Sequence, residues 1–193
     1  MTPPEKLRLF VAADVPEPRR RWLDGEVEDL KTLPGIRWVP VENQHVTLCF
    51  LGSMPSDTLD RVLQIVEEVA GSHAPAAVEL GGLGAFPRER RARVLWAGID
   101  DPEGLLGSLS AALGKAAGPL GAAVEDRAYT PHLTLARFKE PRSLTGLLKA
   151  PVDPEGPFLV DRVVLYRSRL SPKESRYEAI HEAYLRKQAT RSH

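Results

Sequence analysis

Two short segments of the sequence share one pattern, in which a histidine is followed two positions later by a threonine and then a leucine. The first, HVTLCF, begins at His45, and the second, HLTLARF, begins at His132. Both lie in apolar runs that are typical of β-strands. Because side chains alternate between the faces of a strand, Thr47 shares a face with His45 and Thr134 shares one with His132. Each segment therefore has an apolar face for a core and an imidazole–hydroxyl face for another purpose.

Two such faces lining one cleft would suit general acid–base catalysis at phosphorus. The ordinary pKa of histidine is about 6.5, so near neutrality one imidazole can accept a proton while another donates one. In-line displacement needs both, because the attacking oxygen loses a proton on one side of the phosphorus and the leaving oxygen gains one on the other. Threonine hydroxyls can hold the oxygens between them. No metal is required, and a cyclic phosphodiester is a suitable substrate.

Strict alternation also assigns each residue that follows the two patterns to one face of its strand. In a regular strand it places Cys49 on the face of Thr47, under the cleft, although a small buried apolar role is the default for this residue and we do not propose it as a nucleophile. It turns Phe50 toward the core. In the second segment it places Arg137 on the apolar face. A role for Arg137 in the cleft would therefore require the strand to twist, bulge or end there.

The remaining periodicity predicts strands and helices that alternate along the chain. The expected strands cover residues 7–14, 36–40, 45–51, 76–86, 92–99, 129–138, 158–168 and 176–185. The expected helices are an amphipathic one from Pro16 to Leu33, one from an N-cap at Ser56 to Gly71, one from Asp101 and Pro102 to Gly118, and a short one at Leu144–Leu148. The two H-x-T-L strands fall in successive halves of the chain, which suggests an internal duplication. We therefore expect one α+β domain of two similar lobes.

Composition limits the partners that such a domain can have. The chain has 193 residues, 26 basic and 26 acidic, so its formal net charge is zero and any anionic partner must be attracted locally. The one cysteine excludes an internal disulfide, and no apolar stretch approaches membrane-spanning length. We therefore expect a cytoplasmic protein with no membrane association, and the sequence indicates no obligate protein partner.

The paired HVTL and HLTL resemble the two H-x-T-x signatures of the 2H phosphoesterases. The stretches RLFVAADVP, FPRERRARVLWAG, YTPHLTLARF and SRLSPKESRYE further resemble the bacterial and archaeal RNA 2′,3′-cyclic phosphodiesterases, formerly described as 2′-5′ RNA ligases. The resemblance extends from about residue 7 to residue 185. It implies a bilobal fold with a pseudo-two-fold axis, in which antiparallel sheets and outer helices surround a central cleft. Residues 1–193 would then form one catalytic domain, with a core over about 7–185 and a flexible tail at 186–193.

The resemblance also implies an activity and a set of roles. The activity is metal-independent and cofactor-free hydrolysis of RNA 2′,3′-cyclic phosphate ends to 2′-phosphomonoesters, and the older family name implies a reverse reaction, 2′-5′ ligation. His45 would be the proton donor to the departing O3′, and His132 would be the proton acceptor that activates water. Thr47, Thr134 and Arg137 would bind the phosphate.

Other residues are candidates for contacts with RNA, and each also has a structural interpretation. Phe10, Phe86 and Tyr129 could stack on bases at the cleft rim or pack in the core. The cluster Arg88, Arg90, Arg91 and Arg93 could attract an RNA end or form a solvated loop.

Three alternatives for the function stay open. The protein could be a nucleotide-binding module without hydrolysis, although it retains both histidines. It could be a 2H hydrolase of another small cyclic nucleotide or of a 2′-5′ oligoadenylate, since the same catalytic groups would serve. A metal site is a third alternative, but no third ligand repeats with the two motifs.

Overall fold

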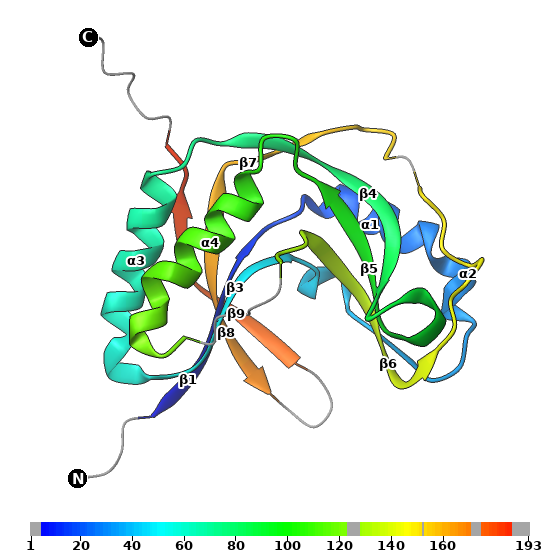
Figure 1. Ribbon diagram of the computed structural model, residues 1–193, viewed down its shortest axis with the longest axis horizontal. Helices are drawn as coiled ribbons and strands as arrows, with labels where there is room; N and C mark the ends of the chain where they lie inside the picture. Colours follow the sequence, from blue (N-terminus) through cyan, green and yellow to red (C-terminus); the bar gives the residue numbers. More distant parts are fainter. Residues whose placement is uncertain (1–4, 123–127, 152, 171–174, 187–193) are drawn as a thin grey trace.

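The strands of the protein form a curled antiparallel sheet that carries helices on its outer side (Figure 1). The computed structural model describes residues 5–122, 128–151, 153–170 and 175–186. The strands are β1 (Lys6–Ala13), β2 (Ile36–Trp38), β3 (Val46–Pro55), β4 (Ala76–Phe86), β5 (Ala92–Asp100), β6 (His132–Arg142), β7 (Phe158–Val160), β8 (Arg162–Leu170) and β9 (Ser175–Tyr184). The α-helices are α1 (Glu17–Glu26), α2 (Glu28–Lys31), α3 (Leu59–Gly71) and α4 (Leu105–Ala117).

One residue pair joins the two halves of this sheet. The strand order is β7-β4-β5-β6-β3-β1-β8-β9, with β2 added to β6. Between β3 and β6 the described ladder is the pair Val46–Leu133 alone, whereas β1 and β3 pair over the whole length of β1. We call the part with β1, β3, β8 and β9 lobe A, and the part with β2 and β4 to β7 lobe B. The expected α+β fold with two lobes is confirmed.

Each lobe carries two helices, but the lobes are not successive halves of the chain. Helices α3 and α4 pack on strands β3, β8 and β9 of lobe A. Helices α1 and α2 lie over lobe B (Figure 1), where Leu33 and Leu83 line one groove and Lys149 forms an ion pair with Asp29 at 3.4 Å. Lobe A therefore combines the first strand of the chain with the last two. Such interleaving cannot be read from a repeated motif.

Several expected elements differ in the structure. Ser56 does not cap a helix, because a short 3-10 helix (Ser56–Thr58) precedes α3. The expected helix at Leu144–Leu148 is a turn, closed by a hydrogen bond from the Leu147 amide to the Leu144 carbonyl at 2.9 Å. The expected strand 158–168 is divided into β7, which pairs with β4, and β8, which pairs with β1 and β9. The expected tail lies, from residue 187 onward, outside the described residues.

The prediction that the Asp101 side chain caps a helix is confirmed. Its carboxylate accepts hydrogen bonds from the amides of Leu105 at 2.9 Å and Leu106 at 2.8 Å, which are among the first amides of α4. Pro102 lies before the helix and not in its first turn. The helices of the described residues are all too short or too polar to cross a membrane.

A β-bulge interrupts each H-x-T-L strand at its leucine. In lobe A, Thr47 and Cys49 of β3 are paired with two successive residues of β1, so that Leu48 between them has no partner in that strand. In lobe B, the register of β6 against β5 passes from Thr134 to Ala136 and skips Leu135. A bulge adds one residue to a strand, so side chains beyond it exchange faces.

The bulges overturn the strict alternation expected for the residues that follow. Cys49 and Ala136 turn into the core, where they are 8% and 0% exposed. Phe50 is 45% exposed instead of buried, and Arg137 is also exposed. Both therefore lie on the side of the sheet that carries the histidines and threonines. The expectation for the faces of Cys49 and Phe50 was wrong.

The packing of Trp96 against Gly84 gives a test of the lobe B sheet. A methyl group on Gly84 would overlap the indole ring of Trp96, which lies across the glycine on the neighbouring strand. We expect Gly84→Ala to lower the free energy of unfolding by about 1 to 3 kcal/mol, because either the ring or the strand must move. Urea denaturation measures this change.

Gly107→Ala is the matched control for this substitution. Gly107 lies inside α4, and a methyl group there would meet nothing within 4 Å. Alanine is the better helix former, so we expect this variant to be more stable than the wild type by up to about 1 kcal/mol. A Gly84→Ala protein as stable as the wild type would contradict the described packing.

Candidate active site

The pair Val46–Leu133 brings the two H-x-T-L segments together. Extending this antiparallel register by one residue in each direction sets His45 opposite Thr134 and Thr47 opposite His132. Residues opposite one another in a ladder point to the same face. Val46 and Leu133 are 2% and 0% exposed, so they face the core, and the histidines and threonines face the other side. Diagonal neighbours in such a ladder are about 7–8 Å apart, which leaves room for a small anion between the imidazoles.

A hydrogen bond across the lobes supports this arrangement. The Tyr129 hydroxyl donates to the backbone carbonyl of Thr47 at 2.9 Å, so the segment that leads into β6 is tied to β3. Burial raises the pKa of Tyr129 above its ordinary value, so its hydroxyl remains a donor throughout the neutral range.

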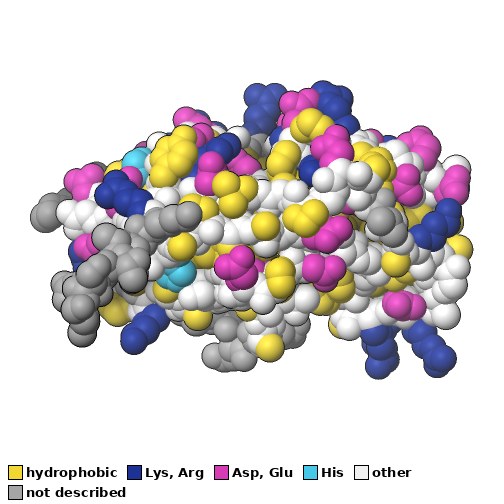
Figure 2. All heavy atoms as spheres, turned by 90° about the horizontal axis from the view of Figure 1, so that it is seen from above, with side chains coloured by type: hydrophobic (Ala, Val, Ile, Leu, Met, Phe, Trp, Pro, Cys, Tyr) yellow, Lys and Arg dark blue, Asp and Glu magenta, His cyan; other side chains and the backbone are white. Residues whose placement is uncertain are grey.

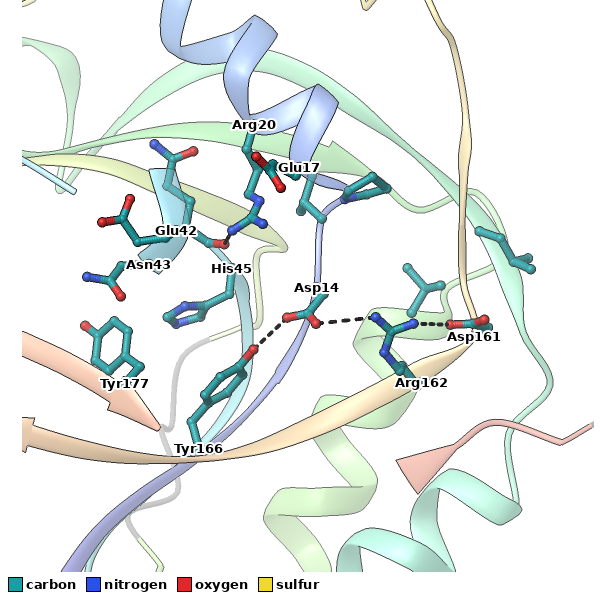
Figure 3. A pocket seen from close by; sticks show the side chains of 15 residues that line it. Asp14, Glu17, Arg20, Glu42, Asn43, His45, Asp161, Arg162, Tyr166 and Tyr177 are labelled. Carbon is teal, nitrogen blue, oxygen red and sulfur yellow. Dashed lines mark hydrogen bonds and ion pairs between the residues drawn. The ribbon is translucent and has the colours of Figure 1, made fainter. Parts of the chain in front are cut away.

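Aromatic rings from lobe A hold the His45 imidazole in place. The ring stacks on Phe10 at 4.8 Å between centroids, and on Tyr166 at 5.8 Å. Tyr177 meets it edge-on at 5.2 Å. Figure 3 shows the two tyrosine rings beside the imidazole. These contacts leave His45 little freedom to turn away from the cleft.

The same surroundings alter the protonation of His45. Burial lowers its pKa from 6.5 to about 4, because an imidazolium is poorly solvated there. A hydrogen bond to the backbone of Asn43 and the negative charge of Asp14 act in the opposite direction, while the positive charges of Arg20 and Arg137 lower the pKa further. Arg137 belongs to lobe B, so its effect on His45 indicates that the two lobes share one electrostatic environment.

Two charged residues support the segment around His45. Asp14, at the end of β1, accepts a hydrogen bond from the Tyr166 hydroxyl at 2.8 Å and lies 3.8 Å from Arg162 (Figure 3). Arg20 of α1 donates to the carbonyl of Val41 at 2.8 Å and to that of Gln44 at 3.3 Å. Arg20 therefore fixes the 3-10 turn (Val41–Asn43) that delivers His45.

His132 has a different environment, which fixes its tautomer. Its Nδ1 lies 2.7 Å from the Thr130 carbonyl oxygen, and because that oxygen can only accept, Nδ1 carries the hydrogen. In the neutral ring the lone pair is then on Nε2. The ring meets Phe86 edge-on at 5.0 Å and lies 6.0 Å from Trp96. A neutral imidazole with this tautomer is suited to accept a proton at Nε2.

A cavity of about 360 Å³ opens beside His45 and is lined by residues of both lobes (Figure 3). Its charged lining consists of Asp14, Glu17, Glu42, Asp161, Arg20 and Arg162. Arg162 already lies within ion-pair distance of Asp14 and Asp161, and Arg20 donates to backbone carbonyls. With an excess of carboxylates and its two guanidinium groups engaged, the cavity is a poor site for a phosphate.

The three aromatic residues predicted to contact bases differ in how far they are buried and in what they contact. Phe10 is 3% exposed and covered by His45, so it cannot present a face to a base. Tyr129 is half-buried and committed to the Thr47 carbonyl. Phe86 is half-buried against His132 and Trp96. Of the predicted aromatic contacts, Phe10 and Tyr129 therefore act in building the site.

The arginine cluster is exposed, whereas the cysteine is buried. Arg88, Arg90, Arg91 and Arg93 are exposed where the chain passes from β4 to β5. Figure 2 shows acidic side chains among basic ones over much of the face in view, in keeping with the neutral net charge.

Burial raises the pKa of the Cys49 thiol to about 11. Among the described residues, no group of three or more histidine, cysteine or acidic side chains is placed to hold a metal ion.

Sequence reasoning missed several residues of the site. Phe50 was assigned to the core because the bulge was not anticipated. Asp14 directly follows β1, and Tyr166 and Trp96 lie on strands that reach the histidines through pairing in the sheet. The two-residue period of the β5 strand sets Trp96 on the face opposite Leu95 and Ala97 and could have indicated it, but no local pattern marks Asp14 or Tyr166.

The fold and the paired motifs define a known family. A family model of the 2′-5′ RNA ligase superfamily matches residues 16–171. The chain therefore belongs to this superfamily of 2H phosphoesterases.

Named relatives of the chain are enzymes. An RNA 2′,3′-cyclic phosphodiesterase of Methanothermobacter thermautotrophicus is 33% identical over 172 residues, which cover 86% of this chain and 92% of the relative. The enzyme of the same name from Thermus thermophilus is 32% identical over 191 residues, covering 93% and 91%. The expected resemblance to bacterial and archaeal RNA 2′,3′-cyclic phosphodiesterases is confirmed.

Solved structures show the same architecture. TT0787 of Thermus thermophilus superposes with a TM-score of 0.82 at 30% identity and covers 94% of this chain and 100% of its own. Escherichia coli LigT in complex with 3′-AMP has a TM-score of 0.80 at 25% identity, with 95% of this chain and 100% of LigT covered.

The lowered pKa of His45 can be measured directly. In NMR titrations of the ligand-free protein, we expect the imidazole of His45 to titrate near 4, so that it is neutral at pH 7. We expect inorganic phosphate to raise this pKa, because a bound anion favours the imidazolium. His45→Gln assigns the resonance.

Asp14→Asn provides the control for the electrostatic account. The Asp14 charge raises the pKa of His45, so its removal should lower that pKa further while the ring contacts stay. A His45 resonance that titrates near 6.5 in the ligand-free protein would contradict the burial described above.

Proposed function

We propose that this protein hydrolyses the 2′,3′-cyclic phosphate ends of RNA to 2′-phosphomonoesters, with His45 as proton donor and His132 as proton acceptor. The observation that carries the proposal is the Val46–Leu133 pair, which sets both histidines and both threonines on one face. The names of the relatives support the substrate class. The two lobes would then act as one catalytic domain. The cytoplasmic location expected from the sequence is part of the same proposal.

The reaction requires one proton transfer on each side of the phosphorus. A water molecule attacks the phosphorus from the side of His132 and gives its proton to Nε2. The bond from phosphorus to O3′ breaks, and O3′ takes a proton from His45. The phosphate remains on O2′. The hydrogen bond from Nδ1 of His132 to Thr130 supports this direction, because it leaves the lone pair of the neutral ring on Nε2.

His45 must carry a proton when the substrate is bound. In the ligand-free protein, burial lowers its pKa to about 4, so the neutral form predominates at pH 7. The negative charge of the cyclic phosphate would raise this pKa, as the Asp14 carboxylate already does. The substrate would therefore help to create the acid that cleaves it.

Three further side chains would hold the phosphate during the reaction. Thr47 and Thr134 lie on the face of the histidines, and their hydroxyls can donate to non-bridging oxygens. The bulge in β6 places Arg137 on that face too, and a guanidinium suits a phosphate. If a 5′-hydroxyl takes the place of the attacking water, it gives its proton to His132, the bond from phosphorus to O3′ breaks and O3′ takes a proton from His45, and the product is a 2′-5′ linkage.

Replacement of either histidine tests the proposal. With an RNA that ends in a 2′,3′-cyclic phosphate, we expect His45→Ala and His132→Ala each to lower kcat by about 10² to 10⁴, the usual contribution of a general acid or base. We expect the wild type to give the 2′-phosphate with or without EDTA. Chromatography against both isomers identifies the product.

His73→Ala is the matched control for these variants. His73 is held by the Val69 carbonyl at 2.7 Å and by the Ser108 hydroxyl at 2.9 Å, between α3 and α4. Its replacement should leave kcat unchanged. Turnover near the wild-type rate after the loss of either cleft histidine, or a 3′-phosphate product, would refute the mechanism.

The pH dependence separates the two roles. The productive enzyme holds one proton on His45 and none on His132, so kcat/KM should be bell-shaped. In His45→Ala only His132 must lose a proton, and the residual rate should rise with pH to a plateau. In His132→Ala only His45 must keep a proton, and the residual rate should fall as pH rises. The same profile in both variants would be inconsistent with the assignment of donor and acceptor.

A further inference from the structure

We propose that Arg37 binds the phosphate on the 5′ side of the terminal nucleotide, the next one along the RNA from the cyclic phosphate. This inference rests on the proposed function and deepens it, because the cleft would then recognise the last two phosphates of an RNA and not the cyclic phosphate alone. Arg37 is the middle residue of β2, and its side chain is exposed.

Pairing in the sheet places Arg37 on the cleft face of lobe B. Arg37 is opposite Arg137 in the β2–β6 ladder, and opposite residues point to the same face. The residues of β6 on either side of Arg137 are Ala136 and Phe138, which are 0% and 5% exposed and so face the core. Both arginines therefore point to the side of the sheet that carries the histidines and threonines.

The position of β2 along β6 brings Arg37 into line with His45. One edge of β6 pairs with β5. The other edge pairs with β3 at Leu133 and with β2 from Ala136 to Phe138, so β2 takes the place of β3 where the two lobes diverge. Along this edge, Arg37 follows His45 on the cleft face.

The two arginines form a local site for anions. Opposite residues of a ladder have Cβ atoms about 4.5–5.5 Å apart, and like charges in such a pair destabilise the sheet. An anion held between the guanidinium groups removes this repulsion, and each group can donate two parallel hydrogen bonds to phosphate oxygens. Because the formal net charge of the chain is zero, such a pair is the kind of local attraction that an anionic partner requires.

The chemistry of the leaving group leads the RNA toward Arg37. O3′ takes its proton from His45, so the terminal ribose lies on the His45 side of the phosphorus. The RNA that precedes this ribose must leave the cleft from that side. The cavity beside His45 is rich in carboxylates and suits a phosphate poorly, whereas the edge of β6 that carries His45 continues to Arg37. Arg137 would then hold the reacting phosphate, and Arg37 the next one.

Three substrates separate the second phosphate from the rest of the RNA. They are a nucleoside 2′,3′-cyclic phosphate with a 5′-hydroxyl, the same nucleotide with a 5′-phosphate, and a dinucleotide with the same cyclic end. We expect Arg37→Gln to lower kcat/KM about 10- to 100-fold on the second and third substrates, and less than about 2-fold on the first. Arg37→Lys, which keeps the charge without the planar fork, should lose less than Arg37→Gln on both.

Two further variants provide controls. Arg137→Gln should lower kcat/KM by similar factors on all three substrates, because all of them contain the reacting phosphate. Arg61→Gln removes the same charge from α3, where Arg61 is exposed and lies 3.8 Å from Glu68. It should change none of the three rates.

The other outcomes would overturn the proposal. Equal losses on all three substrates in Arg37→Gln would mean that Arg37 acts on the reacting phosphate or on the fold. A loss on the dinucleotide alone would mean that Arg37 contacts the preceding nucleoside, and no loss on any substrate would remove it from the site. Failure of the proposed function looks different, because the wild type would then open none of the substrates, or would open them without need of His45 and His132.

Discussion

The active site depends on a single point of contact between two sheets. Val46 and Leu133 form the described ladder between β3 and β6, and both are buried. Because opposite residues of an antiparallel pair share a face, burial of this pair forces the flanking histidines and threonines to the other side. The approximate two-fold relation between the motifs follows from the same pairing. The cleft is thus a consequence of how two half-sheets meet.

The two histidines occupy equivalent positions of the backbone, but the side chains around their imidazoles differ. His45 is enclosed by Phe10, Tyr166 and Tyr177, and burial lowers its pKa to about 4. His132 is fixed by the Thr130 carbonyl in the tautomer that accepts a proton at Nε2. A symmetric pair of histidines could not divide donor and acceptor roles. In the proposed mechanism, these different neighbours on equivalent strands would let two copies of one motif perform opposite proton transfers.

The sequence allowed the shared face of the histidines and threonines and the general fold to be predicted, because both follow from short-range periodicity. The spacing of His45 and Thr47 required one shared face, and the apolar residues between them required a core. The division of the strands between the two lobes was not predictable in this way, because β1 pairs with β8, and through it with β9, only over a long distance in the sequence. The faces of Cys49 and Phe50 were predicted wrongly because a bulge depends on the partner strand and leaves no period in the sequence. Strict alternation had placed Arg137 on the apolar face, and the bulge in β6 turns it to the face of the histidines instead.

The most direct test of the central claim is a crystal structure with a nucleoside oxovanadate, whose trigonal bipyramid imitates phosphorus during in-line displacement. The account predicts one vanadate with Nε2 of His132 about 2.6–3.2 Å from one apical oxygen and the His45 ring at a similar distance from the other. It also predicts the ribose on the His45 side. A vanadate held by one histidine, with the second imidazole turned to a separate environment, would contradict the account.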